Sequence, residues 1–180
     1  MSGLIAVCRG IERVNGAIGK AAAWLTLFMV LVQFALVLMR YVFGTGSLFM
    51  QESVIYAHAI VFMLVAAWTL AEDKHVRVDI FYSTASPRRQ AAINLCGVVF
   101  FLLPMCWLLW WVGYPYVARS WSVLEGSRET SGIPAIFLLK TVILLFVVTL
   151  ALQGLAMAIR SLITILSPSP PGDDAAQRAG

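Results

Sequence analysis

The sequence predicts an all-α integral membrane protein with four transmembrane helices and an additional amphipathic helix at its N-terminus. Of its 180 residues, 61% are hydrophobic and only 12% are charged. A soluble domain of this size cannot bury so much apolar surface, so lipid must cover part of it. Four separate apolar runs approach the roughly 20 residues that a membrane-spanning helix needs. Basic residues flank these runs, as expected at the ends of membrane helices.

The first 20 residues have the pattern of a helix that lies in the membrane interface. On a helix, the side chains of Arg9, Arg13 and Lys20 point to one side. The apolar side chains cluster on the opposite side: Leu4, Val7, Cys8, Ile11, Val14 and Ile18. Three glycines weaken such a helix, and they leave a frayed cytoplasmic tail as the alternative. The next apolar run is longer than a signal-peptide core, which predicts that it stays as the first span.

The four predicted spans form one domain over residues 21–166. Their approximate bounds are residues 21–42, 52–71, 91–115 and 134–160. The remaining residues, 167–180, are rich in Pro, Ser, Gly, Asp and Ala and have no apolar periodicity. They are predicted to form a disordered cytoplasmic tail.

Three of the prolines bear on the predicted shape and starts of the helices. Pro104 lies inside the third run, where it is expected to kink the helix. Ser86 and Pro87 are typical of a cap and first turn that lead into the third helix. Pro134 suits the first turn of the fourth helix.

The basic residues predict that both termini face the cytoplasm. With the N-terminus inside, nine basic residues are cytoplasmic: Arg9, Arg13, Lys20, Lys74, Arg77, Arg88, Arg89, Arg160 and Arg178. Four are outside: Arg40, Arg119, Arg128 and Lys140. The net charge of +4 is thus explained by orienting residues and does not indicate nucleic-acid binding.

No catalytic, cofactor-binding or metal-binding motif is present, so an enzyme is not expected. Cys96 and Cys106 lie ten positions apart on one predicted helix, too far apart to form a disulfide. His58 and His75 are 17 positions apart, about 25 Å along a continuous helix, which argues against a haem held by this pair. His58 is instead expected to form a hydrogen bond to a neighbouring helix, within this chain or in a partner.

Three charged residues lie near the outer ends of the predicted spans. Arg40 ends the first span and Glu52 begins the second, so their side chains either meet or remain two separate solvated charges. Lys140 lies early in the fourth span, where an intramembrane charge is a functional candidate. The fourth helix is long enough for this side chain to extend to the outer head groups, and that interpretation is favoured.

Two further regions are candidate contact surfaces. The cytoplasmic loop that contains His75 and Asp79 is either a solvated turn or a docking surface. The third helix carries Trp107, Trp110 and Trp111, which offer a broad surface to a partner or to lipid.

Several short motifs, in this order and on four spans, resemble the small membrane subunit of tripartite ATP-independent periplasmic (TRAP) transporters, called DctQ-like. The motifs are Arg40-Tyr41-Val42-Phe43-Gly44, Ser47-Leu48, Gln51-Glu52 and His75-Val76-Arg77-Val78-Asp79. Further matches resemble the mannitol/chloroaromatic subgroup: Glu125-Gly126-Ser127, Gly132-Ile133-Pro134, Lys140 and Ala151-Leu152-Gln153-Gly154-Leu155. The sequence departs from many members at Met50 and Ser53, where these have a tryptophan and a second glutamate.

The resemblance implies a structural role in the bacterial inner membrane. In the family, a large permease subunit carries the substrate and sodium sites, and a periplasmic binding protein delivers the substrate, usually an organic acid. The small subunit is a static scaffold beside the permease. Polar residues within the spans are few, and Gln153 suits a helix–helix hydrogen bond better than an ion pathway. Two alternatives are a membrane anchor for a redox enzyme and a self-sufficient, homo-oligomeric small transporter.

Overall fold

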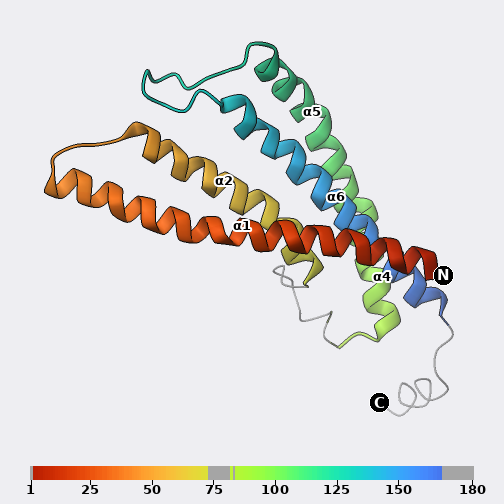
Figure 1. Cartoon of the computed structure of the whole chain (residues 1–180). Coiled ribbons are helices and arrows are strands. Elements are labelled where there is room, and N and C mark those ends of the chain that lie inside the picture. The colour runs from red at the N-terminus through yellow and green to blue at the C-terminus, as the bar shows by residue number, and fades with distance from the viewer. Residues whose placement is uncertain (1, 73–81, 83, 168–180) are drawn as a thin grey trace.

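The computed structural model describes residues 2–72, 82 and 84–167, and these residues form long helices (Figure 1). Four helical rods are long and apolar enough to cross a membrane, which confirms the predicted fold class. Two of the rods are the single helices α1 (Ser2–Val42) and α2 (Leu48–Ala71). The third rod joins α4 (Pro87–Gly97), the π-helical segment η1 (Val98–Leu102) and α5 (Leu103–Ser122). The fourth rod is α6 (Ile136–Leu166).

The last helix, α6, lies at the centre of the molecule. It contacts α1, α2, α4, η1 and α5, and it has the largest share of buried residues among the four rods. Figure 1 shows α1 beside α2 and α5 beside α6, so each pair forms a helical hairpin. The connections 43–47 and 123–135 lie at one end of the molecule, here called the hairpin end. At the other end, Arg88 donates a 2.6 Å hydrogen bond to the carbonyl oxygen of Ser167, which ties the start of α4 to the end of α6.

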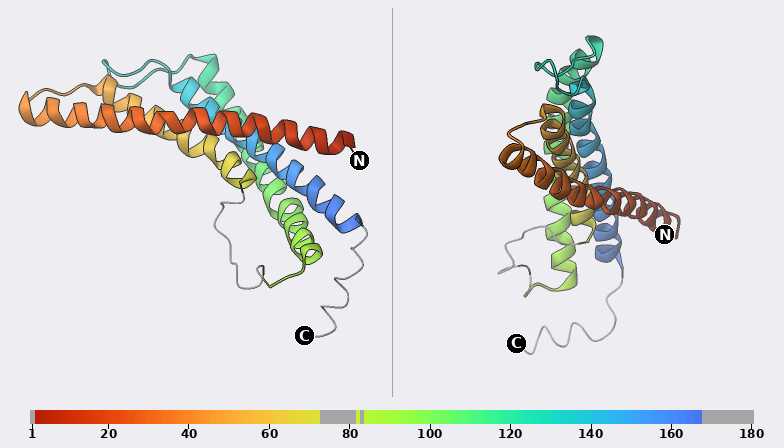
Figure 2. Two further views of the ribbon diagram at one scale, coloured as in Figure 1. Left: turned by 60° about the horizontal axis from the view of Figure 1, so that its bottom comes forward. Right: turned by 60° about the vertical axis from the view of Figure 1, so that its left-hand side comes forward.

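The N-terminal helix differs from its prediction, because α1 runs without a break through the expected boundary at residue 20. Figure 2 shows that it crosses the other helices obliquely. The side chains that pack on the other helices are small or polar: Cys8, Asn15 and Ala22 are buried. Leu4, Val7 and Val14 of the predicted apolar face are more than half exposed, whereas Cys8 of the same face is buried. The predicted apolar face is therefore only partly buried against the other helices. Contact of that exposed face with the membrane interface stays a prediction.

The third rod contains a π-helical segment, η1, one turn before Pro104. The Leu103 N–H bonds to the carbonyl of Val98, the five-residue spacing of a π turn. Proline has no N–H for the carbonyl four residues earlier, and a local π turn is one adjustment by which a membrane helix accommodates such a break. Gly154 of α6 lets η1 approach, because an added Cβ would collide with the Leu102 side chain.

The observed helices extend beyond most of the predicted spans, but α6 begins at Ile136, so Pro134 lies before the helix and not in its first turn. Ser47 caps α2, where its hydroxyl accepts a 3.4 Å hydrogen bond from the backbone of Met50. Ser86 and Pro87 begin α4 as predicted, although the Ser86 side chain forms no capping bond. Residues 168–180 of the expected tail and the loop residues His75 and Asp79 lie outside the described residues.

Candidate functional site

The first polar cluster lies at the hairpin end and is centred on Glu52, in the first turns of α2. One carboxylate oxygen accepts a 2.6 Å hydrogen bond from the Ser127 hydroxyl. The other accepts a 2.5 Å bond from the backbone N–H of Ile133. The carboxylate is thus bound to both arms of the connection between α5 and α6. The alternative in which it meets Arg40 is not realised, and the structure shows no ion pair between these two side chains.

This connection is tightly folded around the Glu52 carboxylate. A Cβ at Gly132 would lie 2.6 Å from a Glu52 carboxylate oxygen and would collide with Ser127. Leu124 adopts φ +46°, a left-handed conformation that is unusual for a branched residue. Glycine at position 132 therefore allows the hydroxyl and the carboxylate to approach each other.

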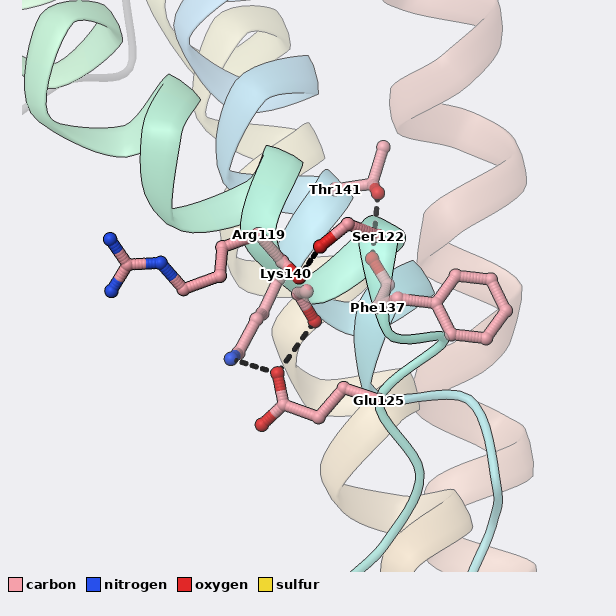
Figure 3. A network of polar contacts seen from close by, with 7 residues as sticks. Arg119, Ser122, Glu125, Phe137, Lys140 and Thr141 are labelled. Atoms are coloured by element: carbon pink, nitrogen blue, oxygen red, sulfur yellow. Dashed lines mark hydrogen bonds and ion pairs between the residues drawn. The ribbon is translucent and has the colours of Figure 1, made fainter.

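Glu125 forms a second anchor in the same connection (Figure 3). Its carboxylate accepts a 2.5 Å bond from the Lys140 ammonium, in an ion pair, and a 2.7 Å bond from the Ser120 hydroxyl. These two bonds, in that order, hold the pKa of Glu125 below its usual value. The Lys140 ammonium also lies 4.1 Å from the centre of the Tyr116 ring.

Lys140 therefore has partners within the protein, which corrects the expectation that it extends to the lipid head groups. Its side chain is only 14% exposed. The ion pair joins the start of α6 to the end of α5. Because the acidic partner lies on an irregular loop, the sequence pattern gave no reason to pair these two residues.

The second polar cluster lies where α1 crosses α6. The Asn15 amide donates a 3.0 Å hydrogen bond to the Gln153 side chain and a 3.4 Å bond to the carbonyl of Thr149. All three residues are buried. At the edge of this crossing, Arg160 and Glu12 form a 2.5 Å ion pair. The interhelical role predicted for Gln153 is thus observed, whereas its partner Asn15 was missed.

A family model for tripartite ATP-independent periplasmic transporters, DctQ component, matches residues 29–164. The chain belongs to this family. Comparison of this DctQ-family subunit with curated proteins and with solved structures gives no significant match. As a DctQ component, it is a multi-pass membrane subunit of a transporter that works with a large permease and a periplasmic binding protein.

The DctQ-family subunit uses its motif residues in different ways. Glu52, Ser127, Ile133, Glu125 and Lys140 form the anchors of the hairpin end. Arg40 is exposed and has no ion-pair or hydrogen-bond partner among the described residues. The structure thus brings together the motifs that contain Glu52, Glu125, Ile133 and Lys140, and it leaves the Arg40 side chain without a partner among the described residues.

The other residues predicted as partner contacts lie on the outer surface of the DctQ-family subunit. His58 is exposed on α2 and stacks on Phe62 with ring centres 6.2 Å apart. Among the described residues it has no hydrogen bond to a neighbouring helix, so only the alternative of a partner chain is left for that prediction. Trp107 and Trp111 are stacked and more than two-thirds exposed, and Trp110 stacks on Tyr114.

The polar groups of this subunit are arranged to join helices. Within the described ranges, no group of three or more His, Cys, Asp or Glu residues is placed to hold a metal ion. One buried side-chain hydroxyl in those ranges, that of Tyr56, has no hydrogen-bond partner. The observed bonds connect α1 to α6, α2 to the 123–135 connection, and α5 to α6. Such an arrangement fixes the relative positions of the rods.

Proposed function

We propose that this chain is the static scaffold of a TRAP transporter of the mannitol/chloroaromatic-like subgroup, in which the large permease subunit performs sodium-coupled uptake of an organic acid. The observation that carries this proposal is the family match over residues 29–164. The geometry supports it, because the buried polar side chains of Asn15 and Gln153 bind each other across two helices. Groups used in this way hold a bundle together.

The proposal includes an orientation in the inner membrane. The hairpin end faces the periplasm, and both termini and the loop with His75 and Asp79 face the cytoplasm. The distribution of basic residues supports this arrangement. The folded 123–135 connection would then be available to the periplasmic binding protein, and the loop with His75 and Asp79 to a cytoplasmic contact.

Two exposed surfaces are the proposed contacts with the permease. The first is the α2 face around His58 and Phe62, where an imidazole lies on a surface that is otherwise apolar. A polar ring within a span is costly in lipid, so a partner group that accepts its hydrogen bond would stabilise it. The second surface is the face of α5 with Trp107 and Trp111, whose exposed aromatic area suits protein or lipid.

Reconstitution tests the scaffold role directly. The permease, the binding protein and a sodium gradient are assembled in vesicles with and without this chain, and uptake of the organic acid is measured. Sodium-driven uptake is expected only when all components are present. An undiminished uptake rate without this chain would refute the scaffold role, and uptake by this chain alone would support a self-sufficient transporter.

Co-purification in mild detergent tests the two proposed surfaces. His58→Ala and Trp111→Ala each remove an exposed ring, and each is expected to weaken recovery of the permease if its surface is the contact. Leu162→Ala, an exposed residue near the far end of α6, is a matched control. Full recovery with both variants would place the interface elsewhere. The redox-anchor alternative predicts a haem or quinone in the purified chain, which absorption spectra would detect.

A further inference from the structure

A half-enclosed cavity with a volume of about 520 Å³ lies at the hairpin end, between α1 and α2. Its polar lining includes Gln33, Arg40, Ser47 and Gln51. Tyr41, Gly46 and the apolar side chains of Leu36, Val37 and Leu48 line the rest. The cavity is distinct from the Glu52 and Glu125 anchors, and its Arg40-Tyr41 motif has no role in them.

Two lining side chains lack a partner. Arg40 and Gln33 form no hydrogen bond or ion pair with any described residue. They lie seven positions apart on α1, about 10 Å along the helix axis and on the same side of the helix. Gln33 lies deeper in the span than Arg40, where an unpaired amide is costly. A ligand with polar groups at both levels would satisfy both side chains.

The cavity lies at the end of a candidate span, where lipid head groups are expected. Arg40 is in the last turn of α1, where a span ends. Three strongly exposed aromatic residues follow closely along the chain: Tyr41 at 82%, Phe43 at 70% and Phe49 at 57%. Exposed aromatic residues at the end of a span are typical of the membrane–water interface. Before Arg40, exposed apolar residues of α1 continue along the span, among them Val30, Phe34 and Val37.

We propose that this cavity binds the head group of an anionic glycerophospholipid. The Arg40 guanidinium binds the phosphate, which is the anion that its paired N–H groups fit. The deeper Gln33 amide donates to an ester carbonyl, and the acyl chains follow the apolar face of α1. This site goes beyond the scaffold role and does not depend on it.

The lining also indicates the charge of the lipid. No acidic side chain lines the cavity, so it offers nothing to pair with the ammonium of an ethanolamine head group. Ser47 and Gln51 instead offer polar groups to a hydroxylated head group. The Ser47 oxygen already accepts a bond from Met50, so its proton remains available to donate. Phosphatidylglycerol is therefore the appropriate probe.

Native mass spectrometry of the full chain, purified in mild detergent and stripped of lipid, measures the binding. Phosphatidylglycerol is expected to bind with a stoichiometry of one high-affinity site, and phosphatidylethanolamine more weakly. Arg40→Ala is expected to weaken phosphatidylglycerol binding about tenfold or more, because a charge-assisted bond is lost. Gln33→Leu is expected to weaken it by a smaller factor. Arg119→Ala, another exposed arginine at the hairpin end, is the control and is expected to bind normally.

Two further arms identify the ligand. Inorganic phosphate at millimolar concentration is expected not to displace the lipid, and displacement would reduce the site to a simple anion site. Circular dichroism melting checks that each variant is folded, and Arg40→Lys retains the charge if Arg40→Ala is unstable. Equal phosphatidylglycerol binding by wild type, Arg40→Ala and Arg40→Lys would overturn the proposal. If Arg40→Ala loses the permease while lipid binding is unchanged, the partner of Arg40 is an acidic group of that subunit.

Discussion

At the residue scale, the two carboxylates of the hairpin end have different hydrogen-bond partners. Glu52 accepts bonds from an uncharged hydroxyl and a backbone N–H, whereas Glu125 pairs with the Lys140 ammonium. Bonds to an ionised carboxylate are stronger than those between neutral groups. The conformation of the 123–135 connection therefore depends on both groups being ionised.

Acidification should loosen this connection through Glu125. Lys140 and Ser120 lower the pKa of Glu125 in the folded protein. Its contribution to stability is therefore fully present above the pKa of an unperturbed glutamate, about 4.3, and is lost as the pH falls through the lower folded value. Thermal melting measured from pH 7 to pH 3 should show this loss. Glu125→Gln should lower the melting temperature at pH 7 and reduce its dependence on pH. An unchanged pH profile in that variant would argue against the ion pair.

The fit around Gly132 can be tested by adding one methyl group. Gly132→Ala places a Cβ against Ser127 and the Glu52 carboxylate, so the anchor must open. We expect a loss of about 1–3 kcal/mol in the free energy of unfolding, as for other overpacked sites. Gly46→Ala, in the other connection of the hairpin end, meets no atom within 4 Å and is the control. Equal stability of the two variants would contradict the tight fit.

These anchors also show why the site was only partly predictable from the sequence. Gln153 stood out as a polar residue inside an apolar run, so its interhelical role could be inferred. Asn15 lies within an amphipathic segment, where a polar residue is ordinary, so the pattern does not indicate that it is buried. The partners of Glu52 and Lys140 depend on the fold of an irregular connection with a left-handed residue at Leu124, which no periodicity reveals.

At the element scale, the spans were predictable because long apolar runs leave few alternatives to membrane helices. The path of α1 across the bundle was not predictable from the sequence. Its N-terminal half has charged and apolar sides, a pattern that also fits a separate surface helix, whereas its packed face is set by the small and polar residues Cys8, Asn15 and Gly19. The π turn before Pro104 depends on backbone hydrogen bonding that the sequence indicates only as a break.

Close approach of α1 to α2 depends on Gly19. An added Cβ would lie 2.7 Å from the Trp68 Cβ and 2.8 Å from its ring, so Gly19→Ala must separate the two helices. We expect a loss of about 1–3 kcal/mol, measured by unfolding in mixed micelles. Gly10→Ala lies on the same helix and meets nothing within 4 Å, so it should be neutral or slightly stabilising. A Gly19→Ala variant as stable as Gly10→Ala would mean that the two helices do not pack this closely.

At the scale of the whole molecule, the 41 residues of α1 are too long for an upright span. They extend about 61 Å, against a hydrocarbon core of about 30 Å. Asn15 lies about 40 Å from the end of α1 at Val42, yet its partner Gln153 lies only about 26 Å from the start of α6. Since both of these ends belong to the hairpin end, α1 must incline strongly against α6, as Figure 2 shows. Because the inclined α1 contacts both α2 and the central α6, it holds these rods together, which suits the proposed scaffold role.

The orientation of this braced bundle gives the last prediction. The excess of basic residues on the side of the termini predicts that the 123–135 connection is periplasmic and that the segment before α4 is cytoplasmic. Thr130 and Thr84 are exposed on these two segments and take no part in the anchors. In a chain without its native cysteines, an impermeant thiol reagent added to intact spheroplasts should label Thr130→Cys. It should label Thr84→Cys only after permeabilisation. The reverse pattern would invert the bundle and place the proposed lipid cavity in the cytoplasmic leaflet.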